Sequence, residues 1–217
     1  PGATIGNGRA TAMQFAREGA EVLVADRDLG SAGETVVMIE DEGGRASACH
    51  VDVTEEASLQ ELSREVLRRY GKVDVLHNNV GMSLAAGDAA VEDITTDAIV
   101  NISSMAAWRP YPYVAYKATK AAVVAFTEQL AQTNARYNIR ANVILPGLMN
   151  TPMAIESRVA AGTPRKTVVS ERDKRVPLGR KMGTAWDVAH AAAFLASDRA
   201  GFITGVALPV DGGSSVS

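Results

Sequence analysis

Hydrophobic positions along the chain fall into short apolar runs separated by longer stretches with helical spacing. The runs predict strands at 21–26, 47–53, 73–78, 98–103, 139–145 and 205–210. The stretches between them predict helices at 9–19, 29–42, 54–70, 113–137 and 184–195, two of them with Thr54 and Thr184 as N-caps. Apolar strands that alternate with helices are typical of a parallel sheet covered on both faces. The pattern therefore predicts an α/β fold, a doubly wound parallel sheet in one domain over 1–217.

Two places depart from this alternation. Pro1 opens directly on a glycine-rich loop, with no strand before it, and no crossover helix is recognisable between Gly81 and Ala98. Parallel neighbouring strands need a connection of about a dozen residues or more, usually helical. We therefore expect residues to be missing before Pro1 and near the Asp97/Ala98 junction, and a continuous peptide bond observed across that junction would contradict the internal gap.

Composition narrows the functional classes. The 217 residues carry 22 Lys+Arg against 25 Asp+Glu, a net charge of −3 without a basic stripe, so nucleic acid is not an expected partner. No apolar run approaches the roughly 20 residues of a membrane span. Cys49 is the single cysteine, which excludes an internal disulfide and favours a reducing, cytoplasmic location. The three histidines and Cys49 have no metal-ligand spacing, so no metal site is expected.

The glycine loop and a later acid together suggest a nucleotide site. Gly2, Gly6 and Gly8 precede a predicted helix, whose backbone amides can receive a pyrophosphate, although a plain tight turn has the same pattern. Asp26 ends the next strand, 18 residues after Gly8, near the offset at which an acid receives ribose hydroxyls. The alternative interpretation of Asp26 is an acidic residue exposed to solvent in a turn. A carboxylate there repels a 2′-phosphate and favours NAD over NADP, whereas the neighbouring Arg27 can hold that phosphate.

At this point the chain resembles the classical short-chain dehydrogenases/reductases over nearly its whole length. The resemblance is carried by Gly2-xxx-Gly6-x-Gly8, Asp52-Val53, Asn78-Asn79-Val80-Gly81, Ile102-Ser103-Ser104, Tyr116-xxx-Lys120, Pro146-Gly147 with Thr151, and Val210-Asp211-Gly212-Gly213. It implies a Rossmann-like three-layer α/β/α fold and an oxidoreductase with a nicotinamide cofactor, NAD with NADP as the alternative.

The resemblance also implies roles for individual residues. Asp52 and Val53 would lie at the adenine, Asn79, Val80 and Gly81 at the adenosine ribose, and Pro146, Gly147, Leu148 and Thr151 at the nicotinamide end. The complete implied cofactor set is Gly2, Thr4, Ile5, Gly6, Asn7, Asp26, Arg27, Asp52, Val53, Asn79, Val80, Gly81, Ile102, Tyr116, Lys120, Pro146, Gly147, Leu148 and Thr151. The alternative for Thr151 is a cap on the segment that follows it.

Ser104, Tyr116 and Lys120 are the catalytic set that the resemblance implies. Tyr116 and Lys120 are four residues apart on one predicted helix and share a face. A free tyrosine has a pKa of about 10, and a nearby ammonium and oxidised nicotinamide would lower it, so that Tyr116 exchanges a proton with the substrate oxygen. Ser104 would hydrogen-bond that oxygen. The alternatives are Ser103 as the catalytic serine, and plain packing for Tyr116 and Lys120.

No residue is available for the further catalytic asparagine of the family, whose helix is the missing one. The segment 152–176 is expected to be a mobile lid over a small alcohol or ketone substrate. Trp108, Tyr111 and Tyr113 line the substrate pocket, form a subunit contact or simply pack. Small residues on the active-site helix, Ala118, Ala121, Ala122 and Ala125, resemble an oligomer interface and favour a homotetramer or homodimer.

Three functions remain open. The first is an NAD-dependent dehydrogenase or reductase of a secondary alcohol or ketone. The second is a 3-oxoacyl-carrier-protein reductase that uses NADPH and the basic side chains of the lid. The third is a nucleotide-binding regulator on the same fold without turnover, which has no need of Ser104, Tyr116 and Lys120.

Overall fold

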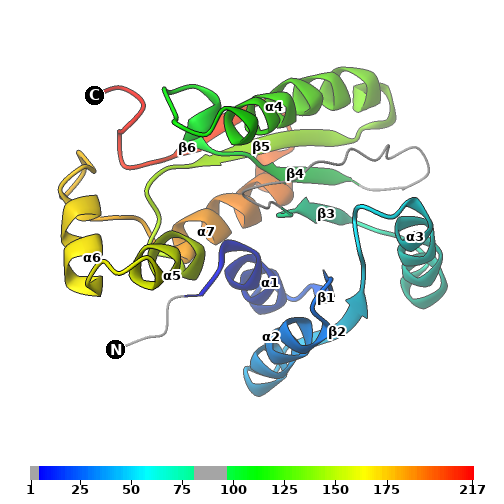
Figure 1. Cartoon of the computed structure of the whole chain (residues 1–217). Helices are drawn as coiled ribbons and strands as arrows, with labels where there is room; N and C mark the ends of the chain where they lie inside the picture. Colours follow the sequence, from blue (N-terminus) through cyan, green and yellow to red (C-terminus); the bar gives the residue numbers. More distant parts are fainter. Residues whose placement is uncertain (1–4, 81–96) are drawn as a thin grey trace.

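Every strand pair is parallel in the computed structural model, which describes residues 5–80 and 97–217 (Figure 1). The strands are β1 (Glu21–Asp26), β2 (Arg45–His50), β3 (Val75–Asn78), β4 (Ala98–Ile102), β5 (Arg140–Pro146) and β6 (Ala207–Val210). The helices are α1 (Asn7–Arg17), α2 (Leu29–Asp41), α3 (Glu56–Tyr70), α4 (Val114–Asn134), α5 (Pro152–Ala160), α6 (Arg165–Asp173) and α7 (Ala185–Ala196), with 3₁₀ turns η1 (Met105–Ala107), η2 (Ala135–Tyr137) and η3 (Asp198–Ala200).

The sheet is divided in two. One part has the order β1-β2 and the other the order β3-β4-β5-β6, and no ladder joins β1 to β3 within the described residues. The strand expected ahead of the glycine loop would precede Pro1. Asp97 and Ala98 are both described, and their N–H groups donate to the carbonyl of Asp74 at 3.0 and 3.1 Å, whereas residues 81–96 lie outside the described residues. A gap near that junction therefore stays a prediction. Helix α1 links the two parts, because it packs on β1 and its Phe15 ring meets that of His77 in β3, with centroids 6.0 Å apart.

The core lies on both faces of the four-stranded part. Side chains of β4 and β5 alternate between the faces, as successive residues of a strand must. Val100 and Ile144 pack with Val188 of α7, whereas Val143 and Leu145 pack with α4 and η1. Helix α4 and helices α1 and α7 therefore cover opposite faces of the sheet (Figure 1). This arrangement confirms the predicted three-layer α/β class.

Two local predictions need correction. Helix α3 begins at Glu56 with Glu55 as its N-cap, because Thr54 instead donates its N–H and hydroxyl to Asp52 Oδ1, at 3.0 and 2.7 Å. The segment 152–176, expected to be a mobile lid and assigned no helix from the sequence, contains α5 and α6, which pack on one another through Ile155 and Val168. At Thr184, by contrast, the predicted cap of α7 is confirmed as a capping box with Asp187.

Polar side chains are buried where α1 faces β3. Asn7 Oδ1, Thr11 Oγ1 and both ring nitrogens of His77 have no hydrogen-bond partner among the described residues. The His77 residue as a whole keeps some exposed surface, but its ring nitrogens do not, and burial lowers its pKa to about 4. The imidazole is therefore neutral at pH 7.

Candidate active site

Two adjacent serines follow β4 and point to different neighbours. Ser103 is buried, and its hydroxyl donates to the carbonyl of Lys120 at 2.6 Å, which fixes α4 to the end of β4. Ser104 is extended, with φ −164°, and its hydroxyl accepts the N–H of Ala106 at 3.1 Å as the N-cap of η1. Ser104 also lies close enough to Tyr116 to lower the pKa of its phenol, whereas the hydroxyl of Ser103 is held inside the fold.

Helix α4 brings Tyr116 and Lys120 to the same place. Lys120 is buried, its ammonium donates to the carbonyl of Ile102 at 3.0 Å, and its Nζ lies 5.9 Å from the centre of the Tyr116 ring. Burial lowers the pKa of Lys120. The structure therefore brings Ser104, Tyr116 and Lys120 together at the carboxyl end of β4, where a doubly wound sheet places its ligands.

The pKa of Tyr116 differs from the expectation. Burial raises it, the hydrogen bond with Ser104 offsets part of the rise, and the nearby Tyr111 adds to it. The expected lowering of the Tyr116 pKa relied on the Lys120 ammonium together with an oxidised nicotinamide. In the structure the ammonium lies over the ring and binds the Ile102 carbonyl rather than the phenol oxygen. A positive nicotinamide is then the remaining source of a downward shift.

Lys117 is a residue that the sequence analysis missed. Its ammonium donates to three carbonyls, those of Ala106 at 3.1 Å, Ala107 at 3.0 Å and Arg109 at 2.9 Å. These carbonyls belong to η1 and the turn after it, which follow Ser104 directly. Lys117 therefore ties the Ser104 loop to the helix of Tyr116. Its only signal in the sequence is its position beside Tyr116.

A buried amide chain supports the same end of the sheet. Asn78 donates to Asn101 Oδ1, and Asn101 donates to Thr127 Oγ1, both at 2.9 Å. Thr127 in turn donates to the carbonyl of Val123 at 2.7 Å. The chain connects β3, β4 and α4, so the strand end that carries Asn79 is fixed to the helix that carries Tyr116.

The start of α1 fits an anion. Gly6 is the N-cap, no side chain within 5–80 and 97–217 caps the helix, and its first turn contains no acid, so the first N–H groups are suited to an anion. A Cβ added at Gly6 would meet nothing within 4 Å, whereas one at Gly8 would lie 2.7 Å from Asn79 Nδ2. Gly6 thus leaves room for a phosphate, and Gly8 is required by packing. Gly2 and Thr4 lie outside the described residues.

The expected adenosine residues gather at the carboxyl ends of β1 and β2. Asp26, exposed, is paired in register with His50 and accepts the N–H of Asp28 at 2.9 Å. Arg27 is exposed beside it. Asp52 follows β2, and its hydrogen bonds from Thr54 hold its pKa low, with a smaller contribution from the charge of Arg27. The three charged side chains therefore share one edge of the sheet.

The expected nicotinamide residues follow β5. Gly147 donates to the carbonyl of Val210 at 3.0 Å, and an added Cβ would lie 2.7 Å from Asp211, so packing requires this glycine. Thr151 is buried at the N-cap of α5 without a side-chain capping bond, which leaves the capping alternative without its hydrogen bond. Two more members of this group lie nearby, because Pro146 ends β5 and Leu148 packs beside α5.

The rest of the expected cofactor set is spread over the other strand ends. Ile102 ends β4, and Ile5 and Asn7 lie at the start of α1. Val53 follows Asp52, Val80 is exposed, and Gly81 lies outside the described residues.

The fold and this arrangement are those of a doubly wound α/β protein in which Ser104, Tyr116 and Lys120 gather at the carboxyl end of one strand. Comparison with known proteins agrees, because a short chain dehydrogenase family model matches residues 1–98 and an enoyl-(acyl carrier protein) reductase model matches residues 89–215. The chain belongs to the short-chain dehydrogenase/reductase family, whose members are NAD(P)-dependent oxidoreductases.

Three relatives illustrate the match. The chain is 30% identical to a 3-oxoacyl-[acyl-carrier-protein] reductase of Thermotoga maritima, over 98% of this chain and 94% of that protein. It is 35% identical to 3beta-hydroxysteroid dehydrogenase 1 of Eggerthella lenta, over 99% and 92%. A solved variant of actinorhodin polyketide ketoreductase with NADPH has a TM-score of 0.88 at 28% identity, over 100% and 95%. The two sequence alignments span 240 and 245 positions, more than the 217 residues present, so some residues of these relatives have no counterpart here.

None of the helices at 5–80 and 97–217 has the length and apolar content needed to cross a membrane. No group of three or more histidine, cysteine or acidic side chains in the same ranges is arranged to hold a metal ion.

Proposed function

We propose that the protein transfers hydride between a nicotinamide cofactor and a secondary alcohol or ketone, with Ser104, Tyr116 and Lys120 as its catalytic residues. The observation that carries this proposal is the meeting of the three side chains at the carboxyl end of β4. The hydroxyl of Ser104 reaches Tyr116, and the Lys120 ammonium lies over the Tyr116 ring. A regulator without turnover has no need for this set, so the cluster also disfavours that alternative.

The residues divide the chemistry between them. Ser104 donates a hydrogen bond to the substrate oxygen, on which negative charge develops. In oxidation Tyr116 takes the alcohol proton at its Oη as the C–O bond becomes a carbonyl, and in reduction it returns that proton. Lys120 supplies positive charge over the Tyr116 ring. The nicotinamide, when bound, accepts or supplies the hydride. Lys117 keeps the Ser104 loop against α4 throughout.

The neighbouring serines offer a matched test. Ser104→Ala is expected to lower kcat by about 10²- to 10³-fold with little change in stability, because one oxyanion donor is lost. Ser103→Ala removes the buried bond to the Lys120 carbonyl, so it should reduce the free energy of unfolding by about 1 kcal/mol and largely spare kcat. Turnover of a panel of alcohols and ketones, measured with unfolding curves, decides between them. The reverse outcome would make Ser103 the catalytic serine.

For the cofactor we propose a preference for NAD, supported by the exposed carboxylate of Asp26 at the end of β1. Asp26→Asn removes the charge that opposes a 2′-phosphate, so the ratio of kcat/KM for NAD to that for NADP should fall about tenfold. Glu21→Gln, at the other end of the same strand, is the control and should leave the ratio unchanged. A ratio that favours NADP in the unaltered protein would assign that phosphate to Arg27 instead.

A second candidate is a 3-oxoacyl-thioester reductase that uses NADPH. It is favoured by one specific observation, the basic side chains on α5, α6 and the turns beside them. Reduction of an acyl thioester with NADPH, faster than any reaction of a simple alcohol with NAD, would support this alternative.

We also propose that α4 pairs with a second copy of the chain, as a homodimer or within a homotetramer. Ala118, Ala121, Ala122 and Ala125 are all exposed on its outer face, and small residues allow close packing of helices. Light scattering of the purified protein should report an oligomer at micromolar concentration, and Ala121→Arg should shift it to the monomer. A monomeric unaltered protein would contradict the proposal.

A further inference from the structure

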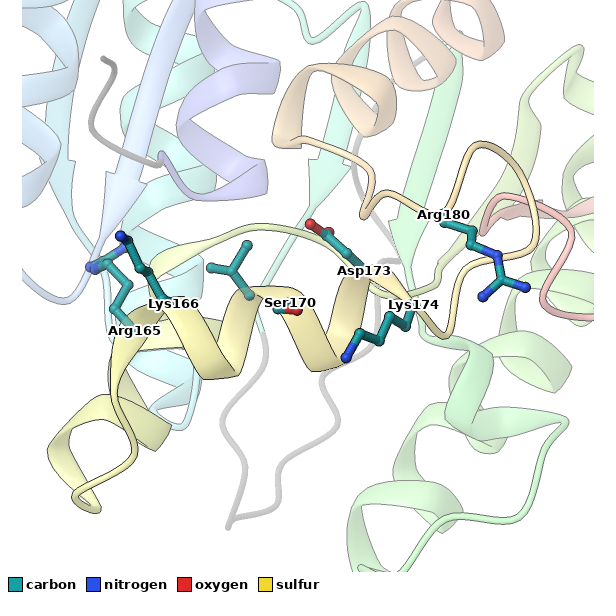
Figure 2. A pocket seen from close by; sticks show the side chains of 7 residues that line it. Arg165, Lys166, Ser170, Asp173, Lys174 and Arg180 are labelled. Carbon is teal, nitrogen blue, oxygen red and sulfur yellow. The ribbon is translucent and has the colours of Figure 1, made fainter.

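The segment that holds α5 and α6 has two basic faces that differ in how their charges are neutralised. Figure 2 shows the first, an opening of about 490 Å³ along α6. Its basic side chains include Arg165, which pairs with Glu156, and Lys174, which pairs with Glu171 at 2.9 Å. Its acid, Asp173, accepts the N–H of Met182 at 2.8 Å. Two of its four basic side chains are therefore ion-paired, whereas Lys166 and Arg180 take part in none of the ion pairs of the described residues.

The second face is a hollow of about 380 Å³ and is not compensated in the same way. It is lined by Arg158, Thr163, Thr167, Val168, Glu171, Arg172, Lys174 and Arg175. Glu171, its one acid, is the residue bound by Lys174. Arg158, Arg172 and Arg175, here called the arginine hollow, take part in none of the ion pairs found within 5–80 and 97–217.

Arg172 is the member of the hollow whose positive charge is most destabilised. It is half-buried, and its Nε donates to Met182 Sδ at 3.2 Å, a weak acceptor for a guanidinium. Burial, followed by the positive charges of Arg158 and Arg175, lowers its pKa to about 10. Arg158 donates to the carbonyl of Ala154, within its own helix. Like charges held together and partly dehydrated are relieved when an anion enters.

The hollow is connected to the catalytic tyrosine through Tyr111. The Tyr111 ring lies 5.2 Å from that of Tyr116, centre to centre. Tyr111 is also near enough to Arg172 to act on its charge. Tyr111 is therefore a common neighbour of Tyr116, through ring contact, and of Arg172, through its effect on that charge, which puts the hollow on the Tyr111 side of the proposed proton donor.

We propose that the arginine hollow binds a phosphoryl group carried by the substrate, at the end of the molecule remote from the reacting carbon. This inference rests on the proposed function, because it gives the substrate of the Ser104–Tyr116–Lys120 site its chemical class. Three guanidinium groups match the charge and the several oxygens of a phosphate better than those of a carboxylate, and guanidinium forks bind such oxygens in pairs. The hydroxyls of Thr163 and Thr167 are further donors. Neutral substrates would leave the hollow unused.

Binding is tested first, without turnover. Calorimetry with inorganic phosphate and with coenzyme A is run on the unaltered protein, Arg172→Gln, Arg175→Gln and the control Arg199→Gln. Arg199 is an exposed residue of η3, after the distal end of α7, and its substitution removes the same charge. Both hollow variants should weaken Kd by about tenfold, as expected for a lost charged hydrogen bond, and the control should not. Arg175 is exposed, so its variant keeps the test valid if Arg172→Gln folds poorly. Equal Kd values in all four proteins would overturn the proposal.

Kinetics then separate the sources of the phosphate. Acetoacetyl-coenzyme A and acetoacetyl-N-acetylcysteamine share the reacting group, but only the first contains phosphate. The hollow variants should raise KM for the first by about tenfold and leave the second unchanged, and inorganic phosphate should compete only with the first. Phosphate that binds the hollow but does not compete would overturn the assignment to the substrate. If both thioesters react with equal KM in every protein, the proposed function holds and the hollow's role fails. If neither reacts but coenzyme A binds through Arg172, the hollow holds and the proposed function fails.

Discussion

The two parts of the sheet differ in how deeply their strand residues are buried. Every residue of β4 and nearly every residue of β5 is buried, between α4 on one face and α7 on the other. Strands β1 and β2 contain only half-buried and exposed residues, and α3 has no buried residue at all. The proposed catalytic side chains lie on the four-stranded part, and the expected adenosine residues lie on the β1–β2 part.

This difference in burial matches a difference in function, because the proposed catalytic residues and the expected adenosine residues need different degrees of rigidity. Proton transfer requires a fixed geometry, and Ser104, Tyr116 and Lys120 receive it from β4 and α4. Two strands alone are marginally stable, so the β1–β2 part depends on its contacts with α1 and α2. The two helices are themselves joined by Arg17 at the end of α1, which donates to both carboxylate oxygens of Glu42, the C-cap of α2, at 2.8 Å. Binding of the adenosine end is thus expected to order the part of the molecule that is least stable.

The largest expected effect is a difference in amide exchange. Amides of β4 and β5 should exchange at least about a hundredfold more slowly than those of β1 and β2, because local opening of β1 and β2 requires less buried surface to be exposed. Addition of NAD should slow exchange in β1 and the start of α1 and leave β5 unchanged. Hydrogen exchange followed by mass spectrometry measures both. Equal protection of the two parts in the free protein would contradict the claim that the β1–β2 part is the less stable one.

The next effect concerns His77, which lies where the two parts meet. Its folded pKa of about 4 lies below the ordinary value of 6.5, so between these values the unfolded chain binds a proton that the folded chain does not. Stability is therefore unaffected above about pH 6.5 and falls as the pH drops towards 4, by about 3 kcal/mol in total.

Urea unfolding between pH 7 and 4 measures this loss. His77→Phe keeps an aromatic ring against Phe15 and should abolish most of the acid loss. His190→Gln, on the exposed side of α7, should retain it. An unchanged pH profile in His77→Phe would show that other groups cause the acid sensitivity.

The smallest expected effect tests the rigidity of the catalytic part. Lys117→Met removes three hydrogen bonds to the carbonyls around η1 and should cost about 1–3 kcal/mol of stability. It should also lower kcat by about tenfold while KM for the cofactor stays within about twofold, because the Ser104 loop loses its tie to α4. Steady-state kinetics and thermal unfolding check both numbers. Restoration of kcat by Lys117→Arg would support positioning, and an unchanged kcat in Lys117→Met would refute it.

The sequence predicted much of this architecture because its apolar runs are short and well separated. The strand at 21–26 has the predicted limits, and Thr184 caps α7 as expected. The α5–α6 pair was missed because basic residues interrupt its apolar spacing, and only packing through Ile155 and Val168 makes its helices visible.

The site was less predictable than the fold. A shift of one residue turns a side chain at the end of a strand to the other face, so the sequence alone could not tell which of Ser103 and Ser104 is held by α4. The direction of the Tyr116 pKa shift depended on where the Lys120 ammonium lies, and spacing along a helix does not give that. The arginine hollow joins residues from α5, α6 and the turn after it, and no sequence motif links them.

The turnover of the Tyr116→Phe variant tests most directly the central claim that Tyr116 carries the proton in the reaction. The unaltered protein and the variant are each mixed with cofactor and a reactive alcohol or ketone, and the absorbance of the reduced nicotinamide is followed while cofactor affinity is measured separately. The account predicts that the variant loses turnover by about a thousandfold or more and binds the cofactor with unchanged affinity, because only the proton carrier is removed. Turnover within about twofold of the unaltered protein would contradict it.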